Sequence, residues 1–235
     1  MRMQQDCFEQ FKQVTSNINN KSIIETHSED VKKAFSYLYI INFISKKVEL
    51  KRFFNTTYYN VSYSCLIECF TLLLEGYPRG SALVLRSSLE NFVKSVIEVV
   101  GQGTYSINDR SYSVNRQTLD NIIENEYPEK YKALFKRTNA QMHNLYGKLS
   151  GLSHSLTPES QNNLLKFFSD ISITSKDNID TVVEKFLSIL EYIFQASLLV
   201  ARTSLEVWER GNLEEVVSFV FGKKRSASTL TLFTP

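Results

Sequence analysis

Residues 179–208 read IDTVVEKFLSILEYIFQASLLVARTSLEVW. Apolar side chains recur along this stretch mostly three or four positions apart, at Ile179, Val182, Phe186, Leu190, Ile193, Phe194, Leu198, Ala201, Leu205 and Trp208. Residues spaced in this way share one face of an α-helix, and that face can be buried against other helices. The pattern predicts one long amphipathic helix that begins near Ser175 and Asp177 and ends at Gly211.

The same periodicity dominates the rest of the chain. It predicts helices over about 31–53, 58–75 and 81–100, a short helix over about 117–125, and a helix from about Pro128 to just before Pro158. No segment shows the sustained period-two alternation of a half-buried strand. The chain has only 4 Pro and 8 Gly, which leaves few residues for turns. We therefore predict an all-α fold, a single helical bundle of four to five long helices with peripheral short helices.

The sequence pattern divides the chain into three parts. Residues 1–28 are polar and weakly periodic, which predicts a peripheral N-terminal segment. Residues 29–211 contain the helices of the bundle. Residues 212–235 are predicted to form a short amphipathic helix and a mobile basic tail, because the apolar segment 213–221 is followed by Lys223-Lys-Arg-Ser-Ala-Ser.

Length and composition are those of a folded globular protein, with 235 residues of which 43% are hydrophobic and 22% charged. A formal net charge of +2 is not the strong positive charge of a general nucleic-acid binder, so any site for a polyanion must be a local patch. The N-terminus lacks the apolar core of a signal peptide, and the most apolar run, residues 65–74, is too short to span a bilayer. These features predict a cytoplasmic protein that does not bind membranes.

Several common active-site chemistries have no motif in this sequence. Gly-x-Ser-x-Gly, a Walker-type phosphate loop and His-Glu-x-x-His are absent, and the Gly-x-Gly at residues 101–103 follows a predicted helix and lacks a third glycine. Cys65 and Cys69 lie four apart in an apolar helix without a second ligand pair, which favours core packing over metal binding. The acidic residues form no paired constellation. We predict that the protein uses no cofactor and no metal.

Arg86 and Glu90 are the first candidates for a functional role. They lie four residues apart in the helix predicted over 81–100, and they flank the apolar stripe Leu85, Leu89, Phe92 and Val96. One interpretation is a plain intrahelical salt bridge, which contributes about 0.3 kcal/mol when exposed. The other is a buried polar network that orients a functional group, because charges among apolar neighbours need partners. The sequence leaves both interpretations open.

Two of the three histidines, His143 and His154, lie in one predicted helix. At about 100° per residue, Gly147, Ser150 and His154 fall within roughly 40° of His143. Glycine is unfavourable inside a helix, so this small-residue face indicates a close approach or a bend. The start of the same helix carries the basic residues Lys130, Lys132, Lys136 and Arg137. Such a run is either a solvated face or, beside histidines, a surface for RNA or phosphate.

These helices resemble the HEPN superfamily, in particular its divergent bacterial branch. The resemblance rests on Leu-Arg86-Ser-Ser-Leu-Glu90 and on Tyr146-Gly-Lys-Leu-Ser150-Gly-Leu-Ser-His154, and it covers roughly residues 30–210 as a HEPN-like bundle. Family members are commonly toxins, abortive-infection and phage-defence proteins, or CRISPR-associated nucleases. Active members are metal-independent endoribonucleases built as dimers, whereas inactive members only bind partners.

The family motif is an arginine followed four to six residues later by a histidine. Arg137 and His143 match this spacing literally. Lys148 and His154 have the same spacing, but lysine lacks the bidentate fork of arginine, and Arg86 of the neighbouring helix would then supply the guanidinium. The sequence leaves open whether Arg137 with His143 or Arg86 with His154 is the working pair.

The resemblance implies a role for each candidate residue. His154 is expected to act as general base on a ribose 2′-OH or as general acid on the leaving 5′-oxygen. Arg86 and Lys148 are expected to stabilise the phosphorane, with Glu90 orienting Arg86. Tyr146 is expected to hold a phosphate oxygen or to stack on a base. The residues expected to contact RNA are Lys132, Lys136, Arg137 and His143.

Three hypotheses about function follow. The first is a metal-independent endoribonuclease that forms 2′,3′-cyclic phosphate ends and acts as a toxin or phage-defence effector, working as a homodimer because two-fold symmetry most simply supplies two histidines. The second is a non-catalytic HEPN-like helical module that binds a protein or nucleic-acid partner and regulates a defence or mobile-element system. The third is a HEPN partner of a nucleotidyltransferase antitoxin.

Overall fold

The computed structural model describes residues 2–153 and 176–233, and every regular element in these two ranges is a helix, which confirms the prediction of an all-α fold. The five long helices of the bundle are α3 (Ser28–Lys46), α5 (Thr57–Leu74), α6 (Pro78–Gly101), α8 (Glu129–Ser153) and α10 (Lys176–Val200). The helices around them are α1 (Arg2–Ser16), α2 (Lys21–Thr26), α4 (Lys51–Phe54), α7 (Tyr112–Glu126), α11 (Arg202–Leu205), α12 (Arg210–Leu230) and the 3₁₀ turn η2 (Thr231–Phe233).

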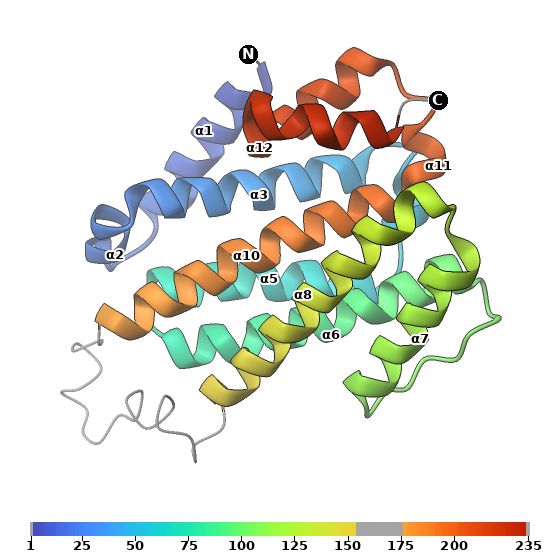
Figure 1. Cartoon of the computed structure of the whole chain (residues 1–235). Coiled ribbons are helices and arrows are strands. Elements are labelled where there is room, and N and C mark those ends of the chain that lie inside the picture. The colour runs from blue at the N-terminus through green and yellow to red at the C-terminus, as the bar shows by residue number, and fades with distance from the viewer. Residues whose placement is uncertain (1, 154–175, 234–235) are drawn as a thin grey trace.

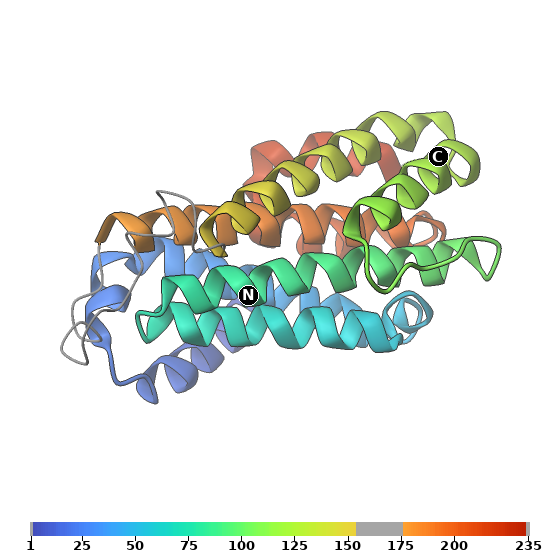
Figure 2. The ribbon, with the colours of Figure 1, turned by 90° about the horizontal axis from the view of Figure 1, so that it is seen from below.

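The bundle is built around α10, which packs on α3, α6 and α8 (Figure 1). Helices α5 and α6 form an antiparallel pair, which is seen side by side in Figure 2. Helices α7 and α8 lie against α6, and α1 and α12 lie against α3. Helix α6 therefore has neighbours on several sides, so the polar side chains along it must either reach those neighbours or face the edge of the bundle.

The α5–α6 pair is fixed at its turn and along its length. Gly76 has a φ of 88°, a left-handed conformation that favours glycine and that ends α5. Further along, the Ser62 hydroxyl donates to the Ser88 carbonyl oxygen and the Ser88 hydroxyl donates to that of Ser62, both at 2.9 Å. These reciprocal bonds are buried and set the rotation of α6 about its axis. They thereby fix the direction in which Arg86 and Glu90 project.

Helix α7 is longer than the sequence pattern predicts. It begins at Tyr112 rather than near residue 117, and the Ser111 hydroxyl caps it by accepting the Val114 N–H at 3.4 Å. The helix expected over 31–53 is divided in the structure into α3 and α4. The longer α7 matters because its first turn reaches α8.

The helix at the C-terminus extends beyond the short amphipathic helix that the sequence predicts over 213–221. Helix α12 runs to Leu230 and changes direction at Gly222, whose φ is 69°. Beyond this point Leu230 and Phe233 are buried, and Arg225 pairs with Glu191 of α10. The basic residues 223–225 and the wide spacing of the apolar residues after them gave no helical periodicity in the sequence. The glycine turns the chain back so that they pack on the bundle.

Candidate functional site

Arg86, Glu90 and Tyr146 form one polar network between α6 and α8. The Arg86 Nε donates to the Glu90 Oε1 at 3.2 Å, and the Tyr146 hydroxyl donates to the same oxygen at 2.8 Å. The guanidinium carbon of Arg86 lies 4.9 Å from the centre of the Tyr146 ring. Because a residue of a second helix completes it, this arrangement matches the network interpretation rather than that of an isolated intrahelical pair.

This Arg86 network is half-buried, with 26% of the Arg86 side chain and 35% of the Glu90 side chain exposed. Burial, and then the hydrogen bond to Glu90, raise the pKa of Tyr146 above its usual value, so the hydroxyl remains a donor at neutral pH. The guanidinium is held by its hydrogen bond to Glu90 and by the ring of Tyr146, and the bond to Glu90 uses only its Nε. Arg86 therefore keeps N–H donors for an anion that approaches from solvent.

Tyr112, the first residue of α7, extends the Arg86 network. Its ring stacks on that of Tyr146, with the ring centres 3.7 Å apart and the planes inclined by 14°. The Tyr112 ring is also nearly parallel to the His143 ring, at 5.8 Å and 13°. Tyr112 thus joins His143 to the neighbourhood of Arg86.

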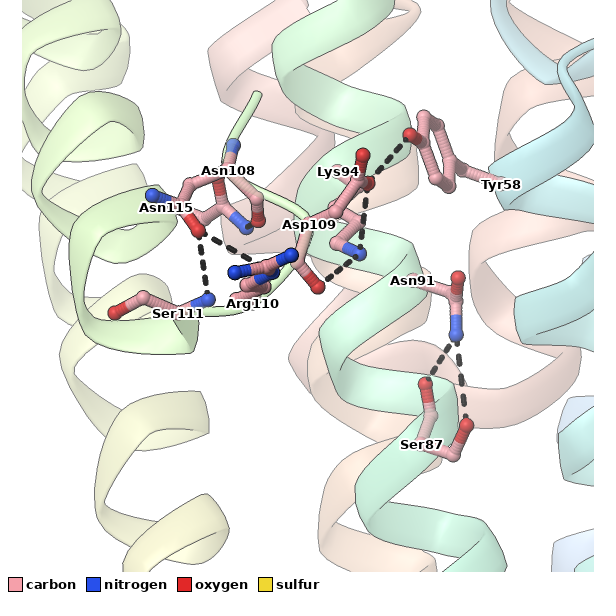
Figure 3. A network of polar contacts seen from close by, with 9 residues as sticks. All are labelled: Tyr58, Ser87, Asn91, Lys94, Asn108, Asp109, Arg110, Ser111 and Asn115. Carbon is pink, nitrogen blue, oxygen red and sulfur yellow. Dashed lines mark hydrogen bonds and ion pairs between the residues drawn. The ribbon is translucent and has the colours of Figure 1, made fainter. Parts of the chain in front are cut away.

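The loop before α7 is folded on itself by two asparagines (Figure 3). The Asn108 N–H donates to the Asn115 Oδ1 at 2.8 Å, and the Asn115 Nδ2 donates to the Asn108 carbonyl at 2.7 Å. The Asn108 Oδ1 accepts the backbone N–H groups of Arg110 and Ser111. These bonds fix the start of α7 and hence the position of Tyr112.

Asp109 ties the same loop to α5 and α6, as Figure 3 shows. Its Oδ1 accepts the Tyr58 hydroxyl at 3.0 Å and the Lys94 ammonium group at 3.3 Å. The bond from Tyr58, followed by that from Lys94, lowers the pKa of Asp109, which keeps the carboxylate charged. The loop therefore places α7 relative to α6, and this brings Tyr112 against Tyr146.

Further along α7, Arg116 and Asp120 meet polar residues of α8. The Asn139 Nδ2 donates to the Asp120 Oδ1 at 2.7 Å, and the Arg116 Nε lies 3.7 Å from the Asp120 Oδ2. Burial lowers the pKa of His143, and the charge of Arg116 lowers it further, against an opposite effect of Asp120. The imidazole of His143 is therefore neutral at pH 7. We call this contact between the two helices the α7–α8 seam.

The α7–α8 seam contains four buried polar atoms without a hydrogen-bond partner in the part of the chain that the structure describes. They are Tyr112 Oη, Arg116 Nε, Asn139 Oδ1 and His143 Nδ1. Buried polar atoms are nearly always hydrogen-bonded, so four exceptions in one seam are unusual.

Arg137 does not belong to this neighbourhood. It lines a groove of about 440 Å³ between α8, α10 and α12, together with Gln195, Phe221 and Arg225. His143 faces α7 instead. The structure therefore does not bring Arg137 and His143 together, and it favours Arg86 as the arginine of the site.

The basic residues at the start of α8 are engaged in ion pairs. Lys132 lies 3.7 Å from Glu124 and 3.3 Å from Glu129, and Lys136 pairs with Glu124. These pairs reduce the positive charge that the surface presents, as the interpretation of a solvated face expects. The RNA contacts of Lys132 and Lys136 stay a prediction.

Lys148 and His154 complete the set of predicted catalytic residues. Lys148 is exposed, and its charge contributes after burial to the lowered pKa of Lys185 on α10. No contact between described residues joins Lys148 to the Arg86 network. His154 lies outside the described residues, and its role stays a prediction.

The glycines of α8 do not accommodate a neighbouring segment of the described chain. A Cβ atom added at Gly147 or Gly151 would meet no described atom within 4 Å. Among the described residues, no neighbouring segment makes the close approach to Gly147 that this glycine was expected to allow. Contact with a second copy, as in the predicted homodimer, stays a prediction.

Sequence reasoning missed four members of the neighbourhood, namely Tyr112, Arg116, Asp120 and Asn139. The first three lie four residues apart, a spacing that places them on one face of a helix. This spacing was overlooked because the helix was predicted to begin near residue 117, which leaves Tyr112 and Arg116 outside it.

Residues 2–153 and 176–233 contain neither a metal-binding cluster nor a membrane span. No three or more His, Cys, Asp and Glu side chains in these ranges gather so that they could hold a metal ion. No helix there combines the length and the apolar character needed to cross a bilayer. Cys69 is buried and Cys65 half-buried in α5, in line with the core-packing interpretation.

Neither a protein-family model, nor a curated protein, nor a solved structure matches this chain. The resemblance to the HEPN superfamily therefore rests on the residues quoted for it.

Proposed function

We propose that this protein is a metal-independent endoribonuclease of HEPN type that acts as a toxin or phage-defence effector. The observation that carries the proposal is the Arg86 network, in which Glu90 and a tyrosine of another helix hold the arginine at a half-buried surface. A guanidinium fixed in this way can bind a phosphate oxygen through its remaining donors. The neutral His143 lies near this network, because the Tyr112 ring stacks on both His143 and Tyr146.

In the proposed reaction, the 2′-OH of a ribose attacks the adjacent phosphorus while a base removes its proton. The bond to the 5′-oxygen breaks, and an acid protonates that oxygen, which leaves a 2′,3′-cyclic phosphate and a 5′-hydroxyl. His154 serves as the base or the acid. Arg86 stabilises the negative charge of the phosphorane, with Lys148 as a second cation.

The contacts of Tyr146 favour a role that differs from the two expected from the resemblance. Its hydroxyl donates to Glu90, and its ring lies against the Arg86 guanidinium. We therefore assign Tyr146 to positioning Glu90 and Arg86 rather than to holding a phosphate oxygen. Glu90 is likewise a positioning residue, because its carboxylate would repel the phosphate.

We further propose that the protein works as a homodimer. Cleavage of this type uses both a base and an acid, and two copies of His154 across a two-fold axis would supply both. A Cβ atom added at Gly147 would meet no described atom within 4 Å, so the described residues leave this position of α8 uncovered.

Comparison of matched variants on single-stranded RNA tests the proposal. His154→Ala and Arg86→Ala should each lower the cleavage rate by roughly 10²-fold, the usual loss for an acid–base or charge-stabilising group. His143→Ala should cost less, because its ring packs against Tyr112 and its Nδ1 is buried. Arg110→Ala removes an exposed arginine outside the site and should leave the rate unchanged.

Two outcomes would overturn the proposal. The first is equal activity of wild type, His154→Ala and Arg86→Ala. The second is intact RNA with every variant, together with equal growth of cells that express wild type and His154→Ala. The second outcome would leave the non-catalytic binding module as the function that fits the bundle.

A further inference from the structure

A cavity of about 570 Å³ lies at the end of the bundle where α4, α6, α10 and α11 meet. Its lining includes three valines, Val99, Val100 and Val200, and two arginines, Arg52 and Arg202. The volume is within the range of small-molecule sites, about 300–1,000 Å³. None of these residues belongs to the Arg86 network or to the α7–α8 seam.

Arg52 is held in the cavity wall by neutral partners. Its Nη2 donates to the Thr203 Oγ1 at 3.3 Å and to the Ser204 Oγ at 3.2 Å. The guanidinium carbon lies 4.6 Å from the centre of the Phe53 ring. These contacts orient the guanidinium group without neutralising its charge.

Arg202, the first residue of α11, is also held by neutral groups. Its Nη2 donates to the backbone carbonyl of Glu126 at 3.0 Å, and its guanidinium carbon lies 3.9 Å from the centre of the Tyr127 ring. In the described part of the chain, no carboxylate lies within ion-pair distance of Arg52 or Arg202. The Glu126 carboxylate also lines the cavity, where its Oε1 accepts the Tyr105 hydroxyl at 3.2 Å.

The charges around the cavity favour an anion. Two guanidinium groups and one carboxylate line it, so the lining carries a net positive charge. Each arginine uses one of its terminal nitrogens in the bonds above, which leaves further N–H donors for a ligand. Pre-oriented guanidinium groups suit a phosphate, whose oxygens accept two N–H bonds side by side. The three valines of the lining can cover an apolar group.

We propose that this cavity binds a small phosphate monoester with a compact apolar body. The phosphate lies between Arg52 and Arg202, with the Thr203 hydroxyl beside it, and the body packs on Val99, Val100 and Val200. The site is separate from the proposed ribonuclease site. Its ligand acts as an effector or as cargo rather than as the RNA that is cleaved.

Titration calorimetry with phenyl phosphate, inorganic phosphate and phenol tests both halves of the site. Phenyl phosphate should bind at least ten-fold more tightly than inorganic phosphate, because roughly 100 Å² of ring surface is buried in addition to the phosphate contacts. Phenol should not bind measurably. Equal affinity for phenyl phosphate and inorganic phosphate, or no heat from either at millimolar concentration, would overturn the proposal.

Matched variants separate a built site from general surface charge. Arg52→Gln and Arg202→Gln should each weaken phenyl phosphate binding at least ten-fold, and Arg202→Lys should weaken it several-fold because the fork is lost. Lys51→Gln removes an exposed cation next to Arg52 on the same helix and should change the affinity less than two-fold. Circular dichroism checks that each variant is folded. A loss with Lys51→Gln as large as that with Arg52→Gln would refute the site.

One further variant keeps this proposal independent of the ribonuclease. Arg86→Gln removes the guanidinium of the other site and should leave phenyl phosphate binding unchanged. Loss of binding in Arg86→Gln would show that the phosphate ester occupies the Arg86 network and would contradict the separate site.

Discussion

Tyr146→Phe removes one hydroxyl and isolates the hydrogen bond that joins α6 to α8. In the structure this hydroxyl donates to the Glu90 carboxylate at 2.8 Å. A hydrogen bond to a charged group contributes about 1.5–3 kcal/mol when buried. Because 35% of the Glu90 side chain is exposed, solvent screens the bond and we expect a loss of about 1 kcal/mol. The phenyl ring of the variant retains the packing against Tyr112 and Arg86.

The free energy of unfolding, measured by urea denaturation followed by circular dichroism, should therefore fall by about 1 kcal/mol, which corresponds to a decrease in Tm of about 2–4 °C for a chain of this size. Tyr105→Phe is the matched control. Its hydroxyl donates to the Glu126 carboxylate at 3.2 Å and accepts a bond from the Asn125 Nδ2 at 3.3 Å, but both bonds are exposed to solvent. Its cost should be less than half as large.

A double-mutant cycle tests whether the loss of stability comes from the hydrogen bond between Tyr146 and Glu90. Tyr146→Phe and Glu90→Gln should show a coupling energy of about 0.5–1 kcal/mol, since the two side chains are in direct contact. Additive losses, or a larger loss from Tyr105→Phe than from Tyr146→Phe, would refute the view that the Arg86 network ties the helices together.

Three further outcomes follow from burial and charge. The lowered pKa of His143 means that the unfolded chain binds its proton more readily, so stability should fall as the pH drops below about 6.5, and His143→Phe should flatten the urea midpoint between pH 7 and pH 5. A slope equal to that of wild type would contradict this assignment. Burial raises the pKa of Tyr112, so the stabilisation that its neutral hydroxyl gives the folded state is complete below pH about 10 and is lost as the pH rises further. In an alkaline titration followed by absorbance, Tyr112→Phe should remove a tyrosine ionisation step that lies above the usual pH range. Leu230→Ala should cost about 2–4 kcal/mol in urea denaturation because Leu230 is buried, whereas Lys224→Ala should cost less than about 0.5 kcal/mol. Equal losses of stability from these two changes would show that Leu230 does not pack on the bundle.

The sequence was sufficient for the long helices because each one buries an apolar stripe with helical spacing. It did not predict where α7 begins, because the first turn of that helix includes the polar residues Ser113 and Asn115 and shows no apolar stripe. The same limit applies to the C-terminal helix, where Leu230 and Phe233 are buried only because the chain turns at Gly222. Periodicity finds a helix face, but it does not show where a glycine redirects the chain.

The candidate site was predictable in part. The resemblance singled out Arg86, Glu90 and Tyr146, and the structure brings these three together. The separation of Arg137 from His143 also follows from helix geometry, since six residues at about 100° each place two side chains about 120° apart. Tyr112 was not predictable, because its contact with Tyr146 depends on how the loop before α7 folds.

The chemistry of the RNA ends formed by the wild-type protein tests the central claim most directly. The protein should be incubated with a single-stranded RNA in excess EDTA, and the products should be resolved and their termini identified by mass. The proposed mechanism predicts 2′,3′-cyclic phosphate and 5′-hydroxyl ends, formed at the same rate with and without EDTA, because the attacking group is the internal 2′-OH and histidine and arginine supply the catalysis. Products with 3′-hydroxyl and 5′-phosphate ends, or cleavage that EDTA abolishes, would contradict it.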